Sequence, residues 1–363
     1  MKKLISASLL AFAAVGLCIK GSAAASGAAG PTPTPVPVVK STTPAAGATP
    51  TPTPLDNPNE IIKVENELVN LDVRVVDRNN RPVNNLTQGD FKILEDGVPQ
   101  RIEFFTQSEV PTNYGLVIDN SGSLRQQLDK VIEAGKVFVN TNRPDDETLV
   151  IRFVGRDKIE IVQNFTANKQ DLNDALDNLY IEGGQTAIRD AVYLAVENID
   201  DYEKSKKTED RKRRALILVT DGEDRNSYYN DKQLLDLLRE SEVQIFVIGF
   251  LDDLSKDGGF ISKSPKDKAK AFLDTLASET GGKAYYPSSP AELPGLAKEI
   301  SNELRTQYSI GYVPSNDRKD GGYRSIKIQV SDGPGGAHRI PISRAGRTAD
   351  GSPTPGTPTK PGN

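Results

Sequence analysis

The sequence contains no tryptophan and has one histidine, one cysteine and one methionine among its 363 residues. Zinc sites in proteins are built mainly from several histidine and cysteine ligands. His338 and Cys18 cannot supply such a set, so we exclude a zinc centre of this kind. A single cysteine also cannot close a disulfide within the chain. The folded protein must therefore depend on core burial and, where one is bound, on a metal with other ligands.

A short apolar segment near the N-terminus is typical of an export signal. Two lysines precede an apolar run over residues 4–19, and small residues suited to a signal peptidase follow it. The run is short for a membrane span, so we predict a signal peptide over residues 1–25 and no integral membrane segment after its cleavage. Leu17 before Cys18 has the wrong size for lipoprotein processing, which argues against lipid anchoring. The sequence thus predicts an exported protein, periplasmic or secreted.

Basic residues are slightly outnumbered by acidic ones. The chain has 45 Lys and Arg against 50 Asp and Glu, and its net charge is −5. Removal of residues 1–25 takes away three lysines and no acidic residue, so the net charge becomes −8. An acidic protein is poorly suited to nucleic acid or to an anionic membrane surface. We therefore expect no nucleic-acid partner, and the charge suits a protein that collects cations.

Proline-rich segments border the part of the chain that can fold. Residues 26–58 are rich in Ala, Pro and Thr, and residues 347–363 repeat the Pro/Thr-rich composition. Such segments cannot bury a core and favour extended polyproline II conformations, so we predict a linker and a disordered tail. Between them lie a β-rich segment at 59–110, a segment of alternating strands and helices at 111–305, and a second β-rich segment at 306–346.

The two β-rich segments each predict three or four strands. Neither is large enough to bury both faces of a sheet alone. We therefore expect residues 59–110 and 306–346 to pair into one small β-sandwich, with the intervening domain inserted between them. The predicted strands lie at about 68–76, 91–94, 102–105, 307–313, 323–330 and 338–342.

Apolar runs alternate with helical segments between residues 111 and 305, which is typical of an α/β domain. Residues 115–118, 216–219 and 245–248 are continuous apolar runs, and such strands belong to a sheet that is covered on both faces. We predict a doubly wound, Rossmann-like, mostly parallel sheet. Further strands are expected at about 149–153, 159–162 and 284–286, and helices at 123–139, 172–179, 188–199, 234–238, 272–276 and 291–304.

Three polar clusters lie where the apolar strands end or in a loop between them. They are residues 119–123 (DNSGS), 183–186 (GGQT) and 220–224 (TDGED). In open α/β sheets, ligands bind beyond the carboxyl ends of the strands. Each cluster offers hydroxyl or carboxylate oxygens on short side chains, which suit Mg²⁺, and also Mn²⁺ or Ca²⁺. The candidate metal ligands are Asp119, Ser121, Ser123, Thr186 and Asp221.

These clusters resemble the metal-ion-dependent adhesion site of the von Willebrand factor type A (VWA) family. The family pattern is Asp-x-Ser-x-Ser, a distant Thr, and a distant Asp within Thr-Asp-Gly. The resemblance covers roughly residues 112–304. It implies that the hydroxyls contact the metal, that the aspartates act directly or through water, and that an Asp or Glu of a partner protein completes the shell. The matching residues are Asp119, Ser121, Ser123, Thr186 and Asp221.

The flanks resemble a narrower group, the VWA-related proteins described from acidobacteria. The resemblance rests on LTQGDFKILEDGVPQRIEFF at residues 86–105 and QYSIGYVPSN at residues 307–316. It says little about function.

Other charged residues beside the clusters have simpler interpretations. We interpret Asp190, Glu223 and Asp224 as solvated or helix-capping residues, since Asp is common at helix starts and in turns. The run of mixed charge at residues 204–214 is interpreted as a solvated loop.

The leading functional prediction is a protein-binding module for adhesion or assembly, not an enzyme. One alternative is a Mg²⁺-dependent phosphohydrolase, which needs an Asp two positions after the first Asp, where this chain has Ser121. The polar clusters contain no His or Lys to activate a hydroxyl nucleophile. The other alternative is a structural metal that ties loops together without binding a partner.

Overall fold

The computed structural model describes residues 68–107, 110–207, 212–252, 254–255 and 263–349. All of them belong to one compact unit, Val64–Asn363. The predicted signal peptide and linker, and nearly all of the predicted tail, lie outside the described residues. Within the described part of the chain, no helix is both long and apolar enough to cross a membrane.

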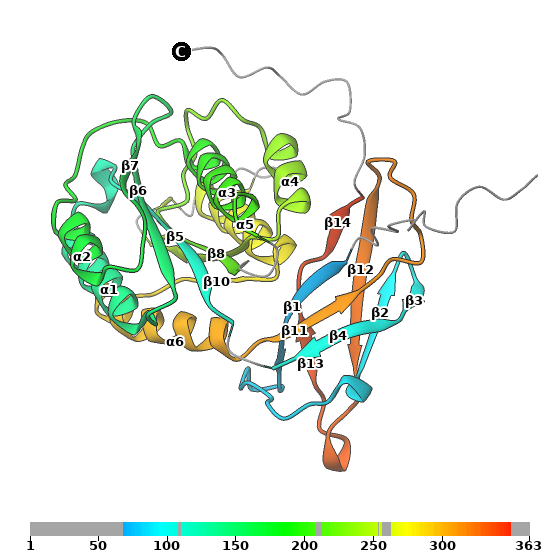
Figure 1. The fold of residues 1–363 in the computed structure, drawn as a ribbon. Coiled ribbons are helices and arrows are strands. Elements are labelled where there is room, and N and C mark those ends of the chain that lie inside the picture. Colours follow the sequence, from blue (N-terminus) through cyan, green and yellow to red (C-terminus); the bar gives the residue numbers. More distant parts are fainter. Residues whose placement is uncertain (1–67, 108–109, 208–211, 253, 256–262, 350–363) are drawn as a thin grey trace, which may run out of the picture. The chain divides into compact units, whose positions relative to one another are not determined.

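A six-stranded sheet forms the centre of the α/β domain (Figure 1). Its order is β10-β9-β8-β5-β6-β7, and all neighbours are parallel except the β6–β7 hairpin. Every residue of β5 and β9 is buried, as expected for continuous apolar strands covered on both faces. The predicted Rossmann-like, mostly parallel sheet is therefore confirmed. The strands are β5 (Thr112–Asp119), β6 (Glu147–Phe153), β7 (Ile159–Thr166), β8 (Arg213–Thr220), β9 (Gln244–Gly249) and β10 (Lys283–Tyr285).

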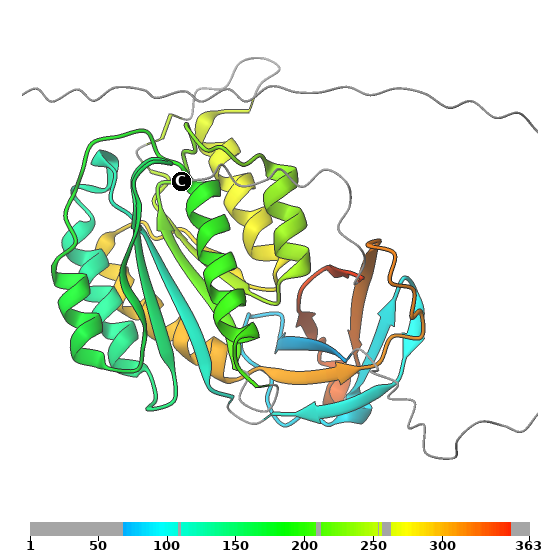
Figure 2. The same cartoon turned by 45° about the horizontal axis from the view of Figure 1, so that its top comes forward.

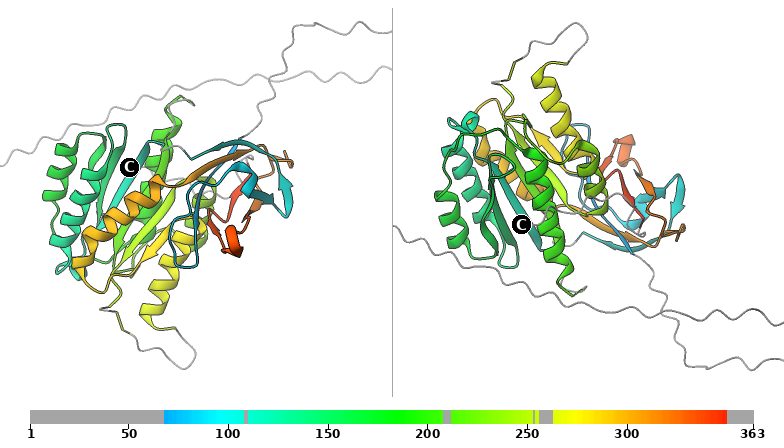
Figure 3. Two further views of the ribbon diagram at one scale, coloured as in Figure 1. Left: turned by 90° about the horizontal axis from the view of Figure 1, so that it is seen from below. Right: turned by 90° about the horizontal axis from the view of Figure 1, so that it is seen from above.

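Helices cover both faces of this sheet (Figures 2 and 3). One face packs against α1, α2 and α6, and the other against α3, α4 and α5. Each helix presents one apolar stripe to the sheet, which follows from apolar residues at helical spacing. The helices are α1 (Leu128–Thr141), α2 (Lys169–Asp177), α3 (Ile188–Lys204), α4 (Asp231–Glu240), α5 (Pro265–Glu279) and α6 (Leu293–Arg305).

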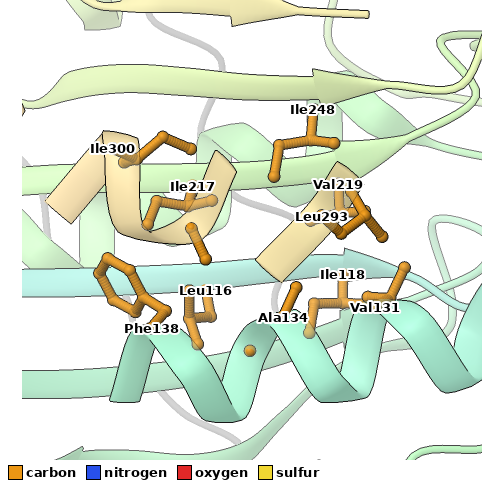
Figure 4. A pocket seen from close by; sticks show the side chains of 12 residues that line it. Leu116, Ile118, Val131, Ala134, Phe138, Ile217, Val219, Ile248, Leu293 and Ile300 are labelled. Atoms are coloured by element: carbon orange, nitrogen blue, oxygen red, sulfur yellow. The ribbon is translucent and has the colours of Figure 1, made fainter. Parts of the chain in front are cut away.

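A small apolar cavity of about 30 Å³ lies between the sheet, α1 and α6 (Figure 4). Leu116 and Ile118 of β5, Phe138 of α1 and Ile300 of α6 are among the side chains that line it. Cavities with apolar walls offer no hydrogen bonds to water and stay dry. We regard it as a packing gap where the two helices meet the sheet.

The flanks pair with each other into a β-sandwich, as predicted. Its sheets have the orders β13-β1-β11-β4 and β14-β12-β2-β3, so each contains strands from both ends of the chain. Tyr308 of β11 connects the two sheets, because the centre of its ring lies 5.2 Å from that of Phe91 in β2. In its own sheet, the centre of the same ring lies 5.7 Å from that of Phe105 in β4. The strands are β1 (Val69–Val76), β2 (Phe91–Glu95), β3 (Val98–Gln100), β4 (Ile102–Thr106), β11 (Tyr308–Tyr312), β12 (Tyr323–Val330), β13 (Ile340–Ile342) and β14 (Gly346–Thr348).

The last strand corrects the predicted start of the tail. Residues 347 and 348 were assigned to the tail, but they form part of β14, which pairs with β12. The guanidinium of Arg347 lies 3.0 Å from the carboxylate of Glu95, and both side chains are buried. The sequence around Arg347 contains no apolar run, so its burial could not be predicted from local pattern.

Arg213, the first residue of β8, joins the α/β domain to the sandwich. Arg213 is 4% exposed, and its guanidinium contacts Asp72 of β1 at 2.9 Å and the carbonyl of Leu304 at 2.5 Å. Arg74 of β1 also pairs with Glu303 of α6. The interpretation of residues 204–214 as a solvated loop was therefore wrong for its C-terminal end.

Candidate metal centre

The first and third polar clusters meet because their strands are neighbours. Asp119 is the last residue of β5, and Asp221 directly follows β8. These strands are parallel and adjacent, so their carboxyl ends lie at the same edge of the sheet. Thr220 bridges the two loops, since its hydroxyl donates to Asp119 Oδ2 at 2.8 Å.

The two serines lie close together in the loop after β5. Ser121 has an extended backbone, and a 3₁₀ turn (Gly122–Leu124) follows it and carries Ser123. The Oγ atoms of the two serines are 2.8 Å apart. Ser121 N donates to Asp119 Oδ1 at 2.9 Å, and the Ser123 hydroxyl lies near enough to Asp221 to lower the pKa of that carboxylate. A connected set of four side chains results, drawn from both loops.

Thr186 is tied through its backbone carbonyl to the loop that carries Asp221. It is 5% exposed and lies just before α3. Its carbonyl accepts hydrogen bonds from the amides of Arg225 at 2.8 Å and Asn226 at 3.2 Å, in the loop that carries Asp221. These bonds hold the second cluster against the third.

Burial dominates the electrostatics of the two aspartates. Burial, and then the nearby charge of Asp221, raise the pKa of Asp119 to about 7. Burial also raises the pKa of Asp221, although its hydrogen bond with Ser123 opposes this. Neither carboxylate forms an ion pair with any described residue. Two buried acidic groups at one edge of the sheet, neither of them in an ion pair, are an arrangement that a divalent ion stabilises.

The donor set fits a hard divalent cation. The five candidates offer two carboxylates and three hydroxyls, and all their donor atoms are oxygens. No three His, Cys, Asp or Glu side chains of the described residues gather as a possible metal site. A metal at this edge would therefore depend on hydroxyl ligands as well as carboxylates.

Two glycines keep the loops close. Gly222 has φ of +83°, a conformation that favours glycine, and it directly follows Asp221. A Cβ at Gly184 would lie 2.5 Å from Val154, so the loop that leads to Thr186 needs glycine to reach its position.

The sequence interpretation missed two supporting residues. Thr220 belongs to the third cluster, and its hydroxyl also fixes the orientation of Asp119. Asp190 is not simply solvated or capping: it is buried and accepts hydrogen bonds from the amides of Tyr228 at 2.8 Å and Tyr229 at 2.9 Å. Its position in the first turn of α3 gives no signal for contact with a loop 38 residues later.

The acidic neighbours of Asp221 have other partners. Asp224 accepts from the amide of Arg189, at the start of α3, and forms an ion pair with the Arg189 guanidinium at 3.0 Å. Glu223 pairs with Arg225. Both carboxylates are therefore occupied by contacts outside the proposed ligand set.

An α/β sheet with hydroxyl and carboxylate oxygens at its carboxyl edge defines a class of metal-binding domain. The sequence matches the von Willebrand factor type A domain over residues 115–299, about half of the chain, and the protein belongs to this family. The family is known for metal-dependent protein–protein interaction and adhesion.

Two relatives illustrate the range of the family. The chain is 29% identical to uncharacterized protein sll0103 of Synechocystis over 50% of its own length and 39% of the relative. It is 27% identical to the bovine inter-alpha-trypsin inhibitor heavy chain H4 over 58% of its own length and 22% of that protein. The chain thus spans well under half of either relative.

Solved structures with a similar fold include two VWA-type proteins. The von Willebrand factor type A protein from Catenulispora acidiphila has 14% identity and a TM-score of 0.44, with 77% of this chain and 73% of that chain covered. Proximal thread matrix protein 1 from the mussel byssus, solved with zinc in its MIDAS motif, has 19% identity and a TM-score of 0.42. The match covers 54% of this chain and 48% of that protein.

Proposed function

We propose that this protein is an exported binding module whose divalent metal receives a carboxylate from a partner protein. The metal is Mg²⁺, or Mn²⁺ or Ca²⁺ in its place. The partner offers an Asp or Glu side chain, and the role is adhesion or assembly in the periplasm or outside the cell. The proposed ligands are Asp119, Ser121, Ser123, Thr186 and Asp221.

The observation that carries the proposal is the buried pair of aspartates at the carboxyl edge. Asp119 and Asp221 approach each other without a cationic side chain in an ion pair, and serine hydroxyls lie between them. Burying ionised carboxylates is costly unless a charge of opposite sign is present. A divalent cation supplies that charge.

The ligand set also accommodates an anionic partner. Two carboxylates at most neutralise a divalent ion, and the hydroxyls add no charge, so an outer carboxylate meets no excess of negative ligand charge at the metal. Mg²⁺ commonly keeps several waters in protein sites, and a partner's carboxylate can replace one of them.

The decisive experiment is a pull-down from an envelope extract with the full chain as bait. We expect a partner to be retained in Mg²⁺ and released in EDTA. Asp119→Ala and Asp221→Ala should abolish retention. Glu223→Gln is the matched control, since it removes an acidic group next to Asp221 that pairs with Arg225 instead. Retention that persists in EDTA or in the aspartate variants would contradict the proposal.

Metal preference needs its own measurement, because the mussel protein carries zinc at its motif. We expect Mg²⁺ and Mn²⁺ to restore binding to the metal-free protein. Restoration by Zn²⁺ alone would show that the donor set does not select a hard cation.

Catalysis and export can each be checked directly. We expect no hydrolysis of p-nitrophenyl phosphate with Mg²⁺; turnover that disappears in Asp119→Ala would favour the phosphohydrolase alternative.

Expression in a bacterial host followed by N-terminal sequencing should show a mature chain that begins after about Ala25. Detection of uncleaved chain alone would contradict export.

A further inference from the structure

Exposed apolar side chains are few in the α/β domain, and two of them lie on the loops of the candidate metal centre. Among the described residues from 112 to 305, the exposed large hydrophobic residues are Ile161, Tyr180 and Tyr228. Tyr180 is 52% exposed and Tyr228 is 53% exposed. Single exposed apolar residues are common, so their positions matter more than their number.

Tyr180 is hydrogen-bonded to Asn120, the residue between the proposed ligands Asp119 and Ser121. Its carbonyl accepts a hydrogen bond from Asn120 Nδ2 at 2.8 Å. Its hydroxyl accepts from Arg152 at 2.6 Å, and the same guanidinium lies 4.2 Å from the centre of the ring. The ring is therefore fixed in place although half of its surface is exposed.

Tyr228 is fixed in a similar way on the other loop. Its amide donates to the buried carboxylate of Asp190 at 2.8 Å. Its ring meets that of Tyr229 edge-on at 5.3 Å, and Tyr229 stacks on Tyr193 of α3 at 3.7 Å. Two residues earlier, the amide of Asn226 donates to the carbonyl of Thr186. The segment that presents Tyr228 is thus tied to a proposed ligand.

The strand that carries Asp119 lies between β6, whose Arg152 contacts Tyr180, and β8, whose following loop carries Tyr228. Arg152, which holds Tyr180, belongs to β6, and Tyr228 lies in the connection from β8 to α4. The strand order β8-β5-β6 puts Asp119, at the end of β5, between these neighbours. A straight segment of a partner that reached the metal from one side could contact a tyrosine before and after it.

We propose that Tyr180 and Tyr228 are anchors for a protein segment in which the metal-binding Asp or Glu is flanked on both sides by apolar side chains. This inference rests on the proposed function and adds the chemistry of the partner around its carboxylate. Tyrosine is enriched among the residues that dominate binding energy at protein interfaces. Its ring supplies apolar contact and its hydroxyl tolerates water, so it remains stable when exposed in the free protein. Rings that are already fixed lose little conformational entropy on binding.

Synthetic peptides with a central glutamate test the proposal with the full chain. One peptide has leucines on both sides of the glutamate and a second has serines there; matched peptides carry glutamine in the centre. Affinity is measured by fluorescence polarisation in Mg²⁺ and in EDTA. We expect the leucine-flanked peptide to bind about tenfold more tightly than the serine-flanked one. Binding of both should disappear in EDTA and with glutamine.

Tyrosine variants test whether Tyr180 and Tyr228 cause the preference for the leucine-flanked peptide. Tyr180→Ala and Tyr228→Ala should each weaken binding of the leucine-flanked peptide about fivefold or more and leave the serine-flanked peptide nearly unchanged. Tyr323→Ala is the matched control, because this tyrosine is 43% exposed but belongs to the sandwich. An unchanged rise in melting temperature with Mg²⁺ would show that the variants still fold and bind metal.

The outcomes separate this inference from the proposed function. EDTA-sensitive binding of glutamate peptides with no preference for leucine, or a preference that survives both tyrosine substitutions, would overturn the role of the tyrosines and leave the metal-dependent module intact. Absence of EDTA-sensitive binding for every glutamate peptide would overturn both.

Discussion

Glu95 shows how a single buried charge holds the two flanks of the chain together. Its carboxylate accepts from the hydroxyl of Tyr312 at 2.5 Å and from Arg347 Nε at 3.0 Å, and its side chain is 2% exposed. Both partners come from the C-terminal flank, more than 200 residues away. Removing one member of a buried ion pair leaves the other charged and desolvated.

We expect Glu95→Ala to lower the free energy of unfolding by about 3–5 kcal/mol. Tyr312→Phe removes one hydrogen bond and should cost less, about 1–2 kcal/mol. Urea unfolding followed by circular dichroism measures both. A loss below about 1 kcal/mol for Glu95→Ala would mean that Arg347 finds another partner or reaches solvent.

Glu147 at the start of β6 predicts a dependence of stability on pH. Burial alone would raise its pKa, but hydrogen bonds from Lys206, Lys212 and Tyr202 outweigh burial and lower the pKa to about 2. A carboxylate whose pKa falls on folding stabilises the folded state above its unfolded pKa, which is about 4.5. This contribution is lost as the pH falls from about 4.5 to about 2.

The variant Glu147→Gln should therefore lose less stability than the wild type between pH 5 and pH 2.5. Urea midpoints at several pH values measure the difference. Glu133→Gln, in an exposed pair with Lys130, serves as the control and should follow the wild type. Parallel pH curves for wild type and Glu147→Gln would refute the role of Glu147.

At the scale of elements, the junction between the α/β domain and the sandwich depends on Arg213. The first residue of β8 reaches Asp72 of β1, the end of α6 at Leu304 and Ser309 of β11, which it contacts at 2.8 Å. One side chain thus connects a central strand, the last helix and the sandwich. Each of its three guanidinium nitrogens makes one of these contacts, and the side chain is buried.

We expect Arg213→Ala to destabilise the protein by about 3–5 kcal/mol, because the Leu304 carbonyl loses its donor and Asp72 keeps only the Ser309 hydroxyl. The loss should fall on the junction, so calorimetry should change from one unfolding transition to two. Arg214→Ala is the neighbouring control, since Arg214 forms its ion pairs with Asp200 and Glu242 of the α/β domain. A single, uniformly shifted transition would show that the two parts still unfold together without Arg213.

For the molecule as a whole, binding of the proposed metal at the carboxyl edge of the sheet should raise the stability of the folded state. A ligand that binds the folded state alone stabilises it by about 2.7 kcal/mol at 100 times its Kd. For a folded part of this size we expect a rise in Tm of about 5–10 °C with saturating Mg²⁺. Differential scanning fluorimetry with Mg²⁺ and with EDTA measures it.

Variants decide whether that rise reports the proposed site. Asp119→Ala and Asp221→Ala should show no rise with Mg²⁺, whereas Glu223→Gln should keep it. A rise that survives both aspartate substitutions would place the stabilising ion elsewhere.

The α/β sheet, its insertion between two β-rich flanks and the identity of the polar clusters could all be predicted from the amino-acid sequence. These features are local: continuous apolar runs such as residues 216–219 predict buried strands, and short polar side chains follow them. Membership of the VWA family rests on the same residues. The pairing of the flanks could also be predicted, because neither was large enough to bury its own apolar faces.

Which charges are buried, and which groups they contact, could not be predicted from the sequence and follows from the folded chain. Asp190, Arg213 and Arg347 belong to charged or polar segments, and their local sequence predicts solvent exposure. Each is buried because a distant group offers the matching hydrogen bonds, and such a match between remote segments leaves no periodic signal in the chain. For the same reason the sequence does not predict that Tyr180 and Tyr228 are exposed and held in place. Their segments are fixed by hydrogen bonds to Asn120 and Asp190, which are distant in the sequence.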